Sequence, residues 1–313
     1  MSSMIQTLKE WSIRSLFEEQ GNLSFEIEGR VFSQPRLLCR NNGRILSKAG
    51  RISWRAVMDG EKVKIYECHG ESQAVFIERV SRHPLLQYYF PTCLMRIGAY
   101  LVVKWVEGKQ VTWRQVRRDQ TLLNQIAGLQ ALIHANSVET QETSCVFDYI
   151  KYLKDRICTF KGIFPLDDII RTIYITLDEN APLAQERITH PDVTAVNLIL
   201  EAGSGNLKLV DNELLTQNSY FLIDLFNTHY SFEPRLEGDL LELYLTRYMD
   251  NGGDLGLLVQ YEDYYCALWY LRLIGSSLEA GAIEKAFRLA QHYIEVGSKA
   301  HPLVQLVRER LIK

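Results

Sequence analysis

The stretch HPDVTAVNLI, from His190 to Ile199, decides how the second half of this 313-residue chain is interpreted. It places the carboxylate of Asp192 five residues before the amide of Asn197. Pro191 has no backbone N–H and disfavours helical geometry at His190, so we expect Asp192 to lie on a loop. Two polar side chains therefore stand at a fixed spacing just before an apolar run.

A β-hairpin is predicted directly after this loop. The run NLIL (197–200) is short and β-prone, GSGN (203–206) favours a turn, and LKLV (207–210) is a second apolar run. Asn197 then stands at the entrance of the hairpin and Asp211 at its exit. Because the open ends of a hairpin are neighbours in space, we expect these two side chains to share one cation.

These residue types suit phosphate transfer from ATP, which needs a group to orient and deprotonate the acceptor hydroxyl and oxygen ligands for Mg²⁺. The segments HPDVTAVNLIL and LKLVDNE resemble the catalytic and metal-binding segments of the aminoglycoside phosphotransferase and choline kinase superfamily. Members typically carry His-Gly-Asp, then Asn five residues beyond the Asp, then Ile-Asp-Trp-Glu or Ile-Asp-Phe-Glu. Here Pro191 and Asn212 depart from that pattern beside the two aspartates.

The resemblance implies an α+β, bilobal protein-kinase-like fold with a small antiparallel β-sheet N-lobe and a mainly helical C-lobe. It implies ATP and Mg²⁺ as cofactors, with Asp192 as the catalytic residue and with Asn197 and Asp211 as metal ligands. Asp, Asn and Gly are also ordinary turn residues, so a surface hairpin without chemistry is the alternative.

Three strands joined by tight turns are predicted upstream, at 44–48, 52–58 and 62–67. The stretch LSKAGRISWRAVMDGEKVKIYE is similar to the family's nucleotide-covering hairpin. The resemblance puts Ser47 and Gly50 in the phosphate loop and makes Lys64 the lysine that contacts the α- and β-phosphates. Lys62 points to the same face of its strand and is the fallback.

A helix is predicted from Glu71 to Arg82, where apolar residues recur at helical spacing. In the kinase plan a glutamate of this helix pairs with the strand lysine. Glu78 and Glu71 are both candidates for pairing with Lys64.

The run YLVVKWVEG (100–108) resembles the family's strand and hinge, whose backbone receives adenine. Residues around Trp105 and Val106 are the expected adenine contacts. A buried strand that simply ends at a glycine turn is the alternative.

We expect two domains: 1–108, a nucleotide-binding lobe with an N-terminal helical extension at 4–19, and 109–313, a helical lobe with the catalytic loop and acceptor site. Amphipathic stretches predict helices at 117–135, 236–249, 261–274 and 283–295. By the same resemblance Asp224 is a buried residue that braces the catalytic loop.

Composition limits the possible partners. The net charge of −3 and the lack of a block of like charge argue against a nucleic-acid or membrane binder. The six cysteines show no C-x-x-C spacing, and no signal peptide or membrane-spanning run is evident, so we expect a cytoplasmic protein with reduced thiols. Nothing in the sequence indicates the oligomeric state.

The sequence therefore predicts an ATP-dependent phosphotransferase that acts on a hydroxyl of a small molecule. A catalytically weak or inactive kinase-like interaction module is the alternative, supported by Pro191 and Asn212. A protein kinase is disfavoured because the interval from Asp211 to Asp224 is short and no Ala-Pro-Glu triplet is present. The sequence does not decide whether the acceptor is an aminoglycoside, a choline-like compound, a sugar or a natural product. Acidic residues that could line a pocket for a cationic acceptor are Glu237, Asp239, Glu242, Glu262 and Asp263.

Overall fold

The computed structural model describes residues 24–38, 53–138, 147–158, 166–182, 186–218, 220–226, 239–297 and 301–311. Ser47 and Gly50, the strand predicted at 44–48 and the helix predicted at 4–19 lie outside these ranges. The chain divides into two compact units. The sheet unit comprises Met1–Gln110, Val138–Phe147 and Leu198–Leu215, and the helical unit comprises Val111–Ser137, Asp148–Asn197 and Thr216–Lys313.

The described part of the sheet unit contains a six-stranded antiparallel sheet with the order β1-β2-β3-β4-β6-β5. The strands predicted at 52–58 and 62–67 are confirmed as β3 and β4. The Asp59-Gly60 turn between them has positive φ at both residues, 49° and 87°, which is the geometry of a type I′ hairpin turn. The strands are β1 (Phe25–Ile27), β2 (Arg30–Leu37), β3 (Ser53–Met58), β4 (Glu61–Glu67), β5 (Cys93–Ile97) and β6 (Tyr100–Lys104).

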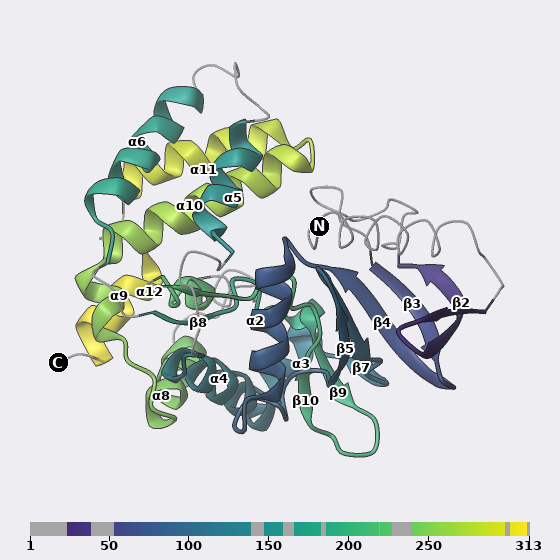
Figure 1. Cartoon of the computed structure of the whole chain (residues 1–313). Helices are drawn as coiled ribbons and strands as arrows, with labels where there is room; N and C mark the ends of the chain where they lie inside the picture. The colour runs from purple at the N-terminus through teal and green to yellow at the C-terminus, as the bar shows by residue number, and fades with distance from the viewer. Residues whose placement is uncertain are drawn as a thin grey trace. The chain divides into compact units, whose positions relative to one another are not determined.

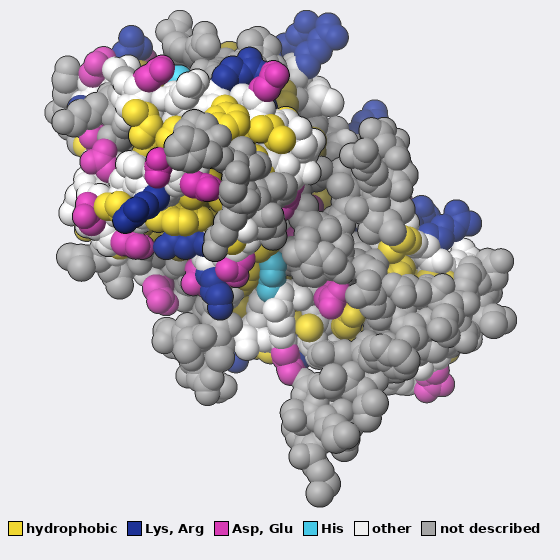
Figure 2. All heavy atoms as spheres, turned by 90° about the horizontal axis from the view of Figure 1, so that it is seen from above, with side chains coloured by type: hydrophobic (Ala, Val, Ile, Leu, Met, Phe, Trp, Pro, Cys, Tyr) yellow, Lys and Arg dark blue, Asp and Glu magenta, His cyan; other side chains and the backbone are white. Residues whose placement is uncertain are grey.

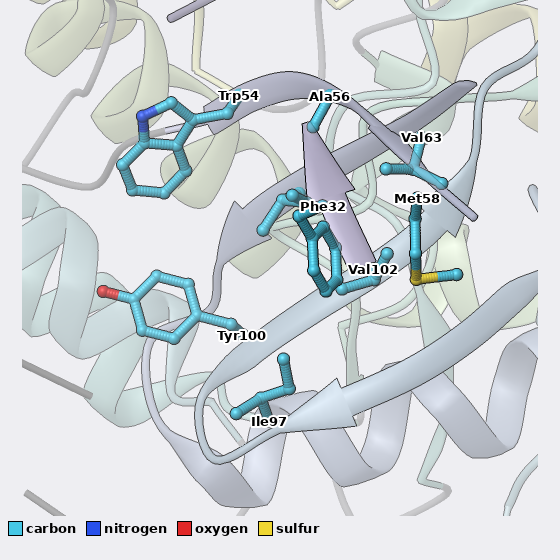
Figure 3. Packing of buried hydrophobic residues seen from close by; sticks show 9 residues of the cluster. Phe32, Trp54, Ala56, Met58, Val63, Ile97, Tyr100 and Val102 are labelled. Carbon is cyan, nitrogen blue, oxygen red and sulfur yellow. The ribbon is translucent and has the colours of Figure 1, made fainter. Parts of the chain in front are cut away.

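Side chains on one face of this sheet pack together in a hydrophobic core, shown in Figure 3. Every second residue of β3 is buried, beginning with Trp54, and Val63 and Ile65 of β4 add to the same cluster. Burying each large side chain contributes roughly 1.5–3 kcal/mol. Because side chains alternate along a strand, Lys62 and Lys64 project from the opposite face. The hydrophobic core therefore packs against the face of β4 opposite to its two lysines.

The helix α2 (Glu71–Arg82) has the bounds expected from the sequence. It packs against β5 and β6, and Figure 1 shows it beside β5. Its buried face contains Ala74, Phe76, Ile77 and Val80, together with the polar residue Gln73. The expected apolar stripe is confirmed at Ala74, Ile77 and Val80, whereas Val75 is only partly buried. The apolar spacing did not account for the buried residues Phe76, Gln73 and Ser81.

A second, three-stranded sheet of the sheet unit contains the predicted hairpin. Strand β9 (Leu198–Glu201) pairs with β10 (Leu207–Leu209) and with β7 (Gly108–Gln110). A Cβ atom added to Gly108 would lie 2.1 Å from the carbonyl oxygen of Leu200, so only glycine allows this approach. The glycine that ends the predicted hinge is therefore required by the pairing of β7 with β9.

The helical unit is built around α10 (Glu262–Glu279), which contacts α5, α6, α9 and α11. The helix predicted at 117–135 is instead two helices, α3 and α4, because Asp119 caps α4 by accepting bonds from the amides of Thr121 and Leu122. The other predicted helices correspond to α8, α10 and α11. The helices are α3 (Trp113–Arg118), α4 (Gln120–Ala135), α5 (Tyr149–Cys158), α6 (Leu166–Glu179), α8 (Asp239–Asp250), α9 (Gly256–Gln260), α11 (Ile283–Val296) and α12 (Pro302–Leu306), followed by the π-helical segment η3 (Val307–Leu311).

The helical unit also contains a short antiparallel pair, β8 (Arg187–Thr189) with β11 (Thr216–Asn218), and a 3-10 turn, η2 (Ala195–Asn197). Figure 2 shows acidic, basic and hydrophobic side chains interspersed on one face of the molecule. None of the helices in the described part of the chain combines the length and the apolar character needed to cross a lipid bilayer.

Candidate active site

The Asp192 segment forms a tight turn between β8 and η2. His190 and Pro191 are buried, and the backbone amide of Asp192 donates to Nδ1 of His190 over 3.3 Å. The Asp192 side chain keeps 29% of its surface exposed. The expected loop position of Asp192 is confirmed: the two preceding residues anchor the turn while the carboxylate reaches the surface.

Asn197 is directed at Asp192. Its amide nitrogen donates to the backbone oxygen of Asp192 over 2.9 Å and to Oδ2 over 3.1 Å. The residue is only 7% exposed. Because both donors of the amide point at Asp192, the orientation of the amide is fixed, and its oxygen accepts no hydrogen bond from the described residues.

Arg272 of α10 holds the other oxygen of Asp192. Its Nη2 donates to Oδ1 over 2.6 Å, and the arginine side chain is 14% exposed. Burial alone would lower the pKa of Arg272, but its interactions with Tyr149 and Asp192 outweigh burial and raise the pKa. Arg272 was not among the site residues predicted from the sequence. Its position in the apolar run LRLI was the available signal, since buried arginines usually have a partner.

Lys64 of β4 points at the segment that follows the hairpin. Its Nζ lies 3.3 Å from Oδ1 of Asp211 and 3.5 Å from the carbonyl oxygen of Val210, and its side chain is 19% exposed. Lys62, the fallback, is half exposed and pairs instead with Glu107 over 2.5 Å. The geometry therefore distinguishes the two lysines: only Lys64 meets the predicted metal ligand.

The predicted pairing of Lys64 with Glu78 or Glu71 is not formed among the described contacts. Arg96 of β5 donates to both glutamates over 3.0 Å, and Arg82 contacts Glu78 over 2.8 Å. The physical reason is the packing of α2 on β5, which brings a delocalised guanidinium within reach of both carboxylates. Because Arg96 lies on a neighbouring strand, the sequence alone could not reveal this competitor.

Helix α2 reaches the Asp211 segment through Gln73. The Gln73 side chain is 2% exposed and donates to the carbonyl oxygens of Glu213, over 2.8 Å, and Leu215, over 3.2 Å. Asn212, where the family has an aromatic residue, is 5% exposed and donates to the carbonyl oxygen of Leu209 over 3.1 Å. Two buried amides thus fix the backbone around Asp211. Gln73 was not predicted as a site residue. A polar residue on the otherwise apolar face of α2 was the sequence feature that could have indicated it.

A cavity of about 150 Å³ in the sheet unit lies beside Lys64. The backbone amide of Trp105 already donates to the carbonyl oxygen of Lys62 over 3.0 Å, and the backbone amide of Lys104 donates to the carbonyl oxygen of Thr92. The amide of Val106 donates no hydrogen bond within the described ranges, so it is available to a ligand. The lining is mostly apolar: Leu38, Lys64, Pro91, Val103, Lys104, Trp105, Val106, Ile199 and Val210.

Asp224 is fully buried in the helical unit. Its Oδ2 accepts from the side-chain amide of Gln130 over 3.1 Å, and its Oδ1 lies 2.9 Å from Nε2 of His134. Both partners belong to α4, and Nδ1 of His134 lies 2.9 Å from the hydroxyl of Tyr248 on α8. The burial expected for Asp224 is confirmed, and these contacts tie its segment to α4 and α8.

The predicted metal ligands are oxygen donors, as Mg²⁺ requires. The Asn197 amide oxygen is unused by the described contacts, and the Asp211 side chain is 36% exposed beside Lys64. The donor chemistry therefore fits magnesium. Asn197 ends one segment of the helical unit and Asp211 belongs to the sheet unit, so their sharing of one cation stays a prediction. In the described ranges, no group of three or more His, Cys, Asp or Glu residues could hold a metal ion.

Comparisons with known proteins give similarity in structure only. No family model matches the sequence, and no curated protein matches it. An amicoumacin kinase in complex with AMP-PNP, Ca²⁺ and Ami has a TM-score of 0.66 at 11% identity, over 98% of this chain and 100% of that one.

Two further solved structures of kinases are similar to this chain in structure. A choline kinase from Cryptosporidium parvum has a TM-score of 0.57 at 12% identity, over 89% of this chain and 91% of that one. An ethanolamine kinase from Plasmodium vivax has a TM-score of 0.55 at 11% identity, over 83% and 81%. The fold expected from the sequence is thereby confirmed: this chain has the α+β fold of these kinase structures, with an antiparallel N-terminal sheet and a helical C-terminal part.

Proposed function

We propose that the chain is an ATP-dependent phosphotransferase that phosphorylates a hydroxyl group of a small molecule. The observation that carries the proposal is in the sheet unit, where Lys64 both lines the apolar cavity and contacts Asp211. A mostly apolar cavity beside a cation and a carboxylate suits a base, its phosphates and their metal ion. The kinase-like fold supports the same conclusion.

In this proposal the cavity holds adenine. The free amide of Val106 donates to the adenine edge, and the Trp105 segment forms the wall. Lys64 exchanges its contact with Asp211 for the α- and β-phosphates. Ser47 and Gly50 cover the phosphates, as the sequence resemblance implies.

Asn197 and Asp211 would hold Mg²⁺ through the free amide oxygen and the carboxylate. When bound, the ion neutralises charge on the phosphates. The Asn197 amide is already oriented for this role because both of its donors are engaged by Asp192.

Asp192 acts on the acceptor. Its carboxylate accepts the hydrogen bond of the acceptor hydroxyl and takes up the proton as the hydroxyl oxygen bonds to the γ-phosphorus of ATP. The bond from that phosphorus to the bridging oxygen breaks, and ADP leaves. The anchored turn supports this role because it fixes the position of the carboxylate.

The test combines binding with transfer. We expect ATP with Mg²⁺ to raise the melting temperature of the protein and ATP without Mg²⁺ to do so much less. A panel of hydroxyl acceptors is then screened for ADP release, with Asp192→Ala as the blank. A protein that binds no nucleotide at millimolar ATP would refute the proposal.

One observation favours a second candidate, the catalytically inactive nucleotide-binding or interaction module. Asp192 is already engaged by Arg272 at 2.6 Å, and an occupied carboxylate is a poorer base. The same experiment decides between the two: magnesium-dependent binding without transfer to any acceptor, and without ATP hydrolysis, identifies the inactive module.

A further inference from the structure

The ion pair between Asp192 and Arg272 determines the charge that an acceptor meets in the helical unit. The two side chains are joined over 2.6 Å and are 29% and 14% exposed, so water screens them only partly. A guanidinium stays protonated at any physiological pH. The negative charge that Asp192 would otherwise present to a cationic acceptor is therefore matched by a fixed positive charge.

Tyr149 does not change this balance. Burial raises the pKa of its hydroxyl to about 12, so the phenol is neutral at pH 7. It interacts with both Arg272 and Asp192 without adding a charge. Asp192 is thus the charged partner of Arg272.

The acidic residues considered for a cationic pocket are partly accounted for elsewhere. Glu242 pairs with Arg310, and Glu262 pairs with Arg308. Both acids are therefore engaged at the C-terminal segment η3. The described contacts offer no support for an acidic pocket at either position.

We propose that the acceptor carries an anionic group, a carboxylate or a phosphate, near the hydroxyl that is phosphorylated, and that Arg272 binds this group. The inference rests on the proposed function. An acceptor hydroxyl that bonds to Oδ1 of Asp192 shares that oxygen with Arg272. An anionic group on the same molecule gives the guanidinium a second anionic partner, whereas an ammonium group adds like-charge repulsion.

The geometry of an arginine suits this exchange. A guanidinium has five N–H donors in a planar fork that matches carboxylate and phosphate oxygens; Asp192 takes one donor at Nη2, and the Tyr149 hydroxyl accepts another. Arg272 can therefore keep Asp192 positioned while it contacts the acceptor. Its role is to select the acceptor and to position Asp192.

The experiment uses three sugars that differ in one group: glucuronate, glucose and glucosamine. With the full chain and Mg²⁺-ATP, we expect kcat/KM for glucuronate to exceed that for glucosamine at least about tenfold, the effect of one charge-assisted contact. In Arg272→Met the ratio should fall to about one or invert. Arg272→Lys keeps the charge without the fork and should retain part of the preference.

Arg308→Met is the matched control, because it also breaks an arginine–carboxylate pair of the helical unit but lies on η3. It should leave the glucuronate-to-glucosamine ratio unchanged. A loss of folded protein lowers all rates together and does not alter this ratio, so the ratio separates selection from stability.

The outcomes distinguish the two proposals. If Mg²⁺-ATP produces no thermal shift, the proposed function fails. If it does, but glucuronate neither turns over nor stabilises the Mg²⁺-ADP complex better than glucose and glucosamine do, the inference is overturned. A preference for glucuronate that survives in Arg272→Met also overturns it.

Discussion

The two aspartates predicted from the sequence to act in phosphate transfer both contact a cationic side chain, but in different ways. Asp211 of the sheet unit lies 3.3 Å from Lys64, and its side chain is 36% exposed. Asp192 of the helical unit lies 2.6 Å from Arg272 and is 29% exposed. The pair in the helical unit is thus shorter and less exposed on both sides.

The difference indicates different tasks. A lysine ammonium is a compact charge on a flexible stem, so Lys64 can leave Asp211 for another anion at little cost. An arginine on a packed helix presents a rigid fork, so Arg272 fixes Asp192 in place. Under the proposed function, the Lys64–Asp211 pair is an exchangeable pair that would release Lys64 to an arriving nucleotide, and the Arg272–Asp192 pair is a fixed pair that would help select the acceptor.

Removing Asp192 should give the largest effect. We expect Asp192→Ala to reduce kcat about 10²- to 10⁴-fold, the range for losing a positioned general base. Binding of Mg²⁺-ATP, measured by calorimetry, should change much less than turnover, because the Asn197 amide keeps its bond to the backbone oxygen of residue 192. Asp192→Asn keeps the shape and separates lost charge from lost packing. Wild-type turnover in Asp192→Ala would remove this residue from the mechanism.

Removing Asp211 should instead weaken nucleotide binding. We expect Asp211→Asn to weaken Mg²⁺-ATP binding at least about tenfold, by analogy with the cost of perturbing a metal ligand's surroundings. The stabilisation by ATP should also be lost when EDTA removes the metal. If Asp211→Asn binds Mg²⁺-ATP normally, the metal role must belong to other residues.

The two lysines of β4 give the next comparison. Lys64→Ala should raise KM for ATP about 10- to 100-fold, because a hydrogen bond to a charged group is worth roughly 1.5–3 kcal/mol. Lys62→Ala should change KM less than about threefold, because its pair with Glu107 is exposed and water screens it. Equal effects of the two substitutions would contradict the distinction between the lysines.

The sequence predicted those parts of the structure that depend on neighbouring residues. The bounds of α2, the strands β3 and β4, and the β9–β10 hairpin follow from apolar spacing and turn residues. The break at Asp119 was also local, since Asp is a strong N-cap, but the continuous apolar pattern concealed it.

The sequence could not predict which charged groups would pair. Glu78 has several cations within reach in principle, and the choice of Arg96 depends on how α2 packs on β5. Arg272 lies 80 residues beyond Asp192, so no spacing rule links them. Tertiary packing decides which charged side chains form ion pairs. The candidate site depends on these ion pairs more than the fold does.

The amide clamp on the Asp211 segment should have a moderate effect on stability. Gln73→Leu leaves the carbonyl oxygens of Glu213 and Leu215 without their buried donor, at a cost of about 1–3 kcal/mol. Denaturant unfolding measures this loss. Gln87→Leu is the matched control, because the only described bond of its side chain is an exposed one to the carbonyl oxygen of Pro84, and it should change stability by less than about 0.5 kcal/mol. Equal losses in the two variants would contradict the clamp.

The smallest expected effect concerns Glu78. In the structure its carboxylate contacts Arg96 and Arg82 rather than Lys64. Glu78→Gln should therefore reduce stability by about 1 kcal/mol or less and leave KM for ATP within about twofold. In a double-mutant cycle with Lys64→Ala, the effects on KM should add, because residues that share no contact are energetically independent. A coupling above about 1 kcal/mol would mean that Glu78 reaches Lys64 once nucleotide is bound. Lys64 would then leave Asp211 and contact both the phosphates and Glu78.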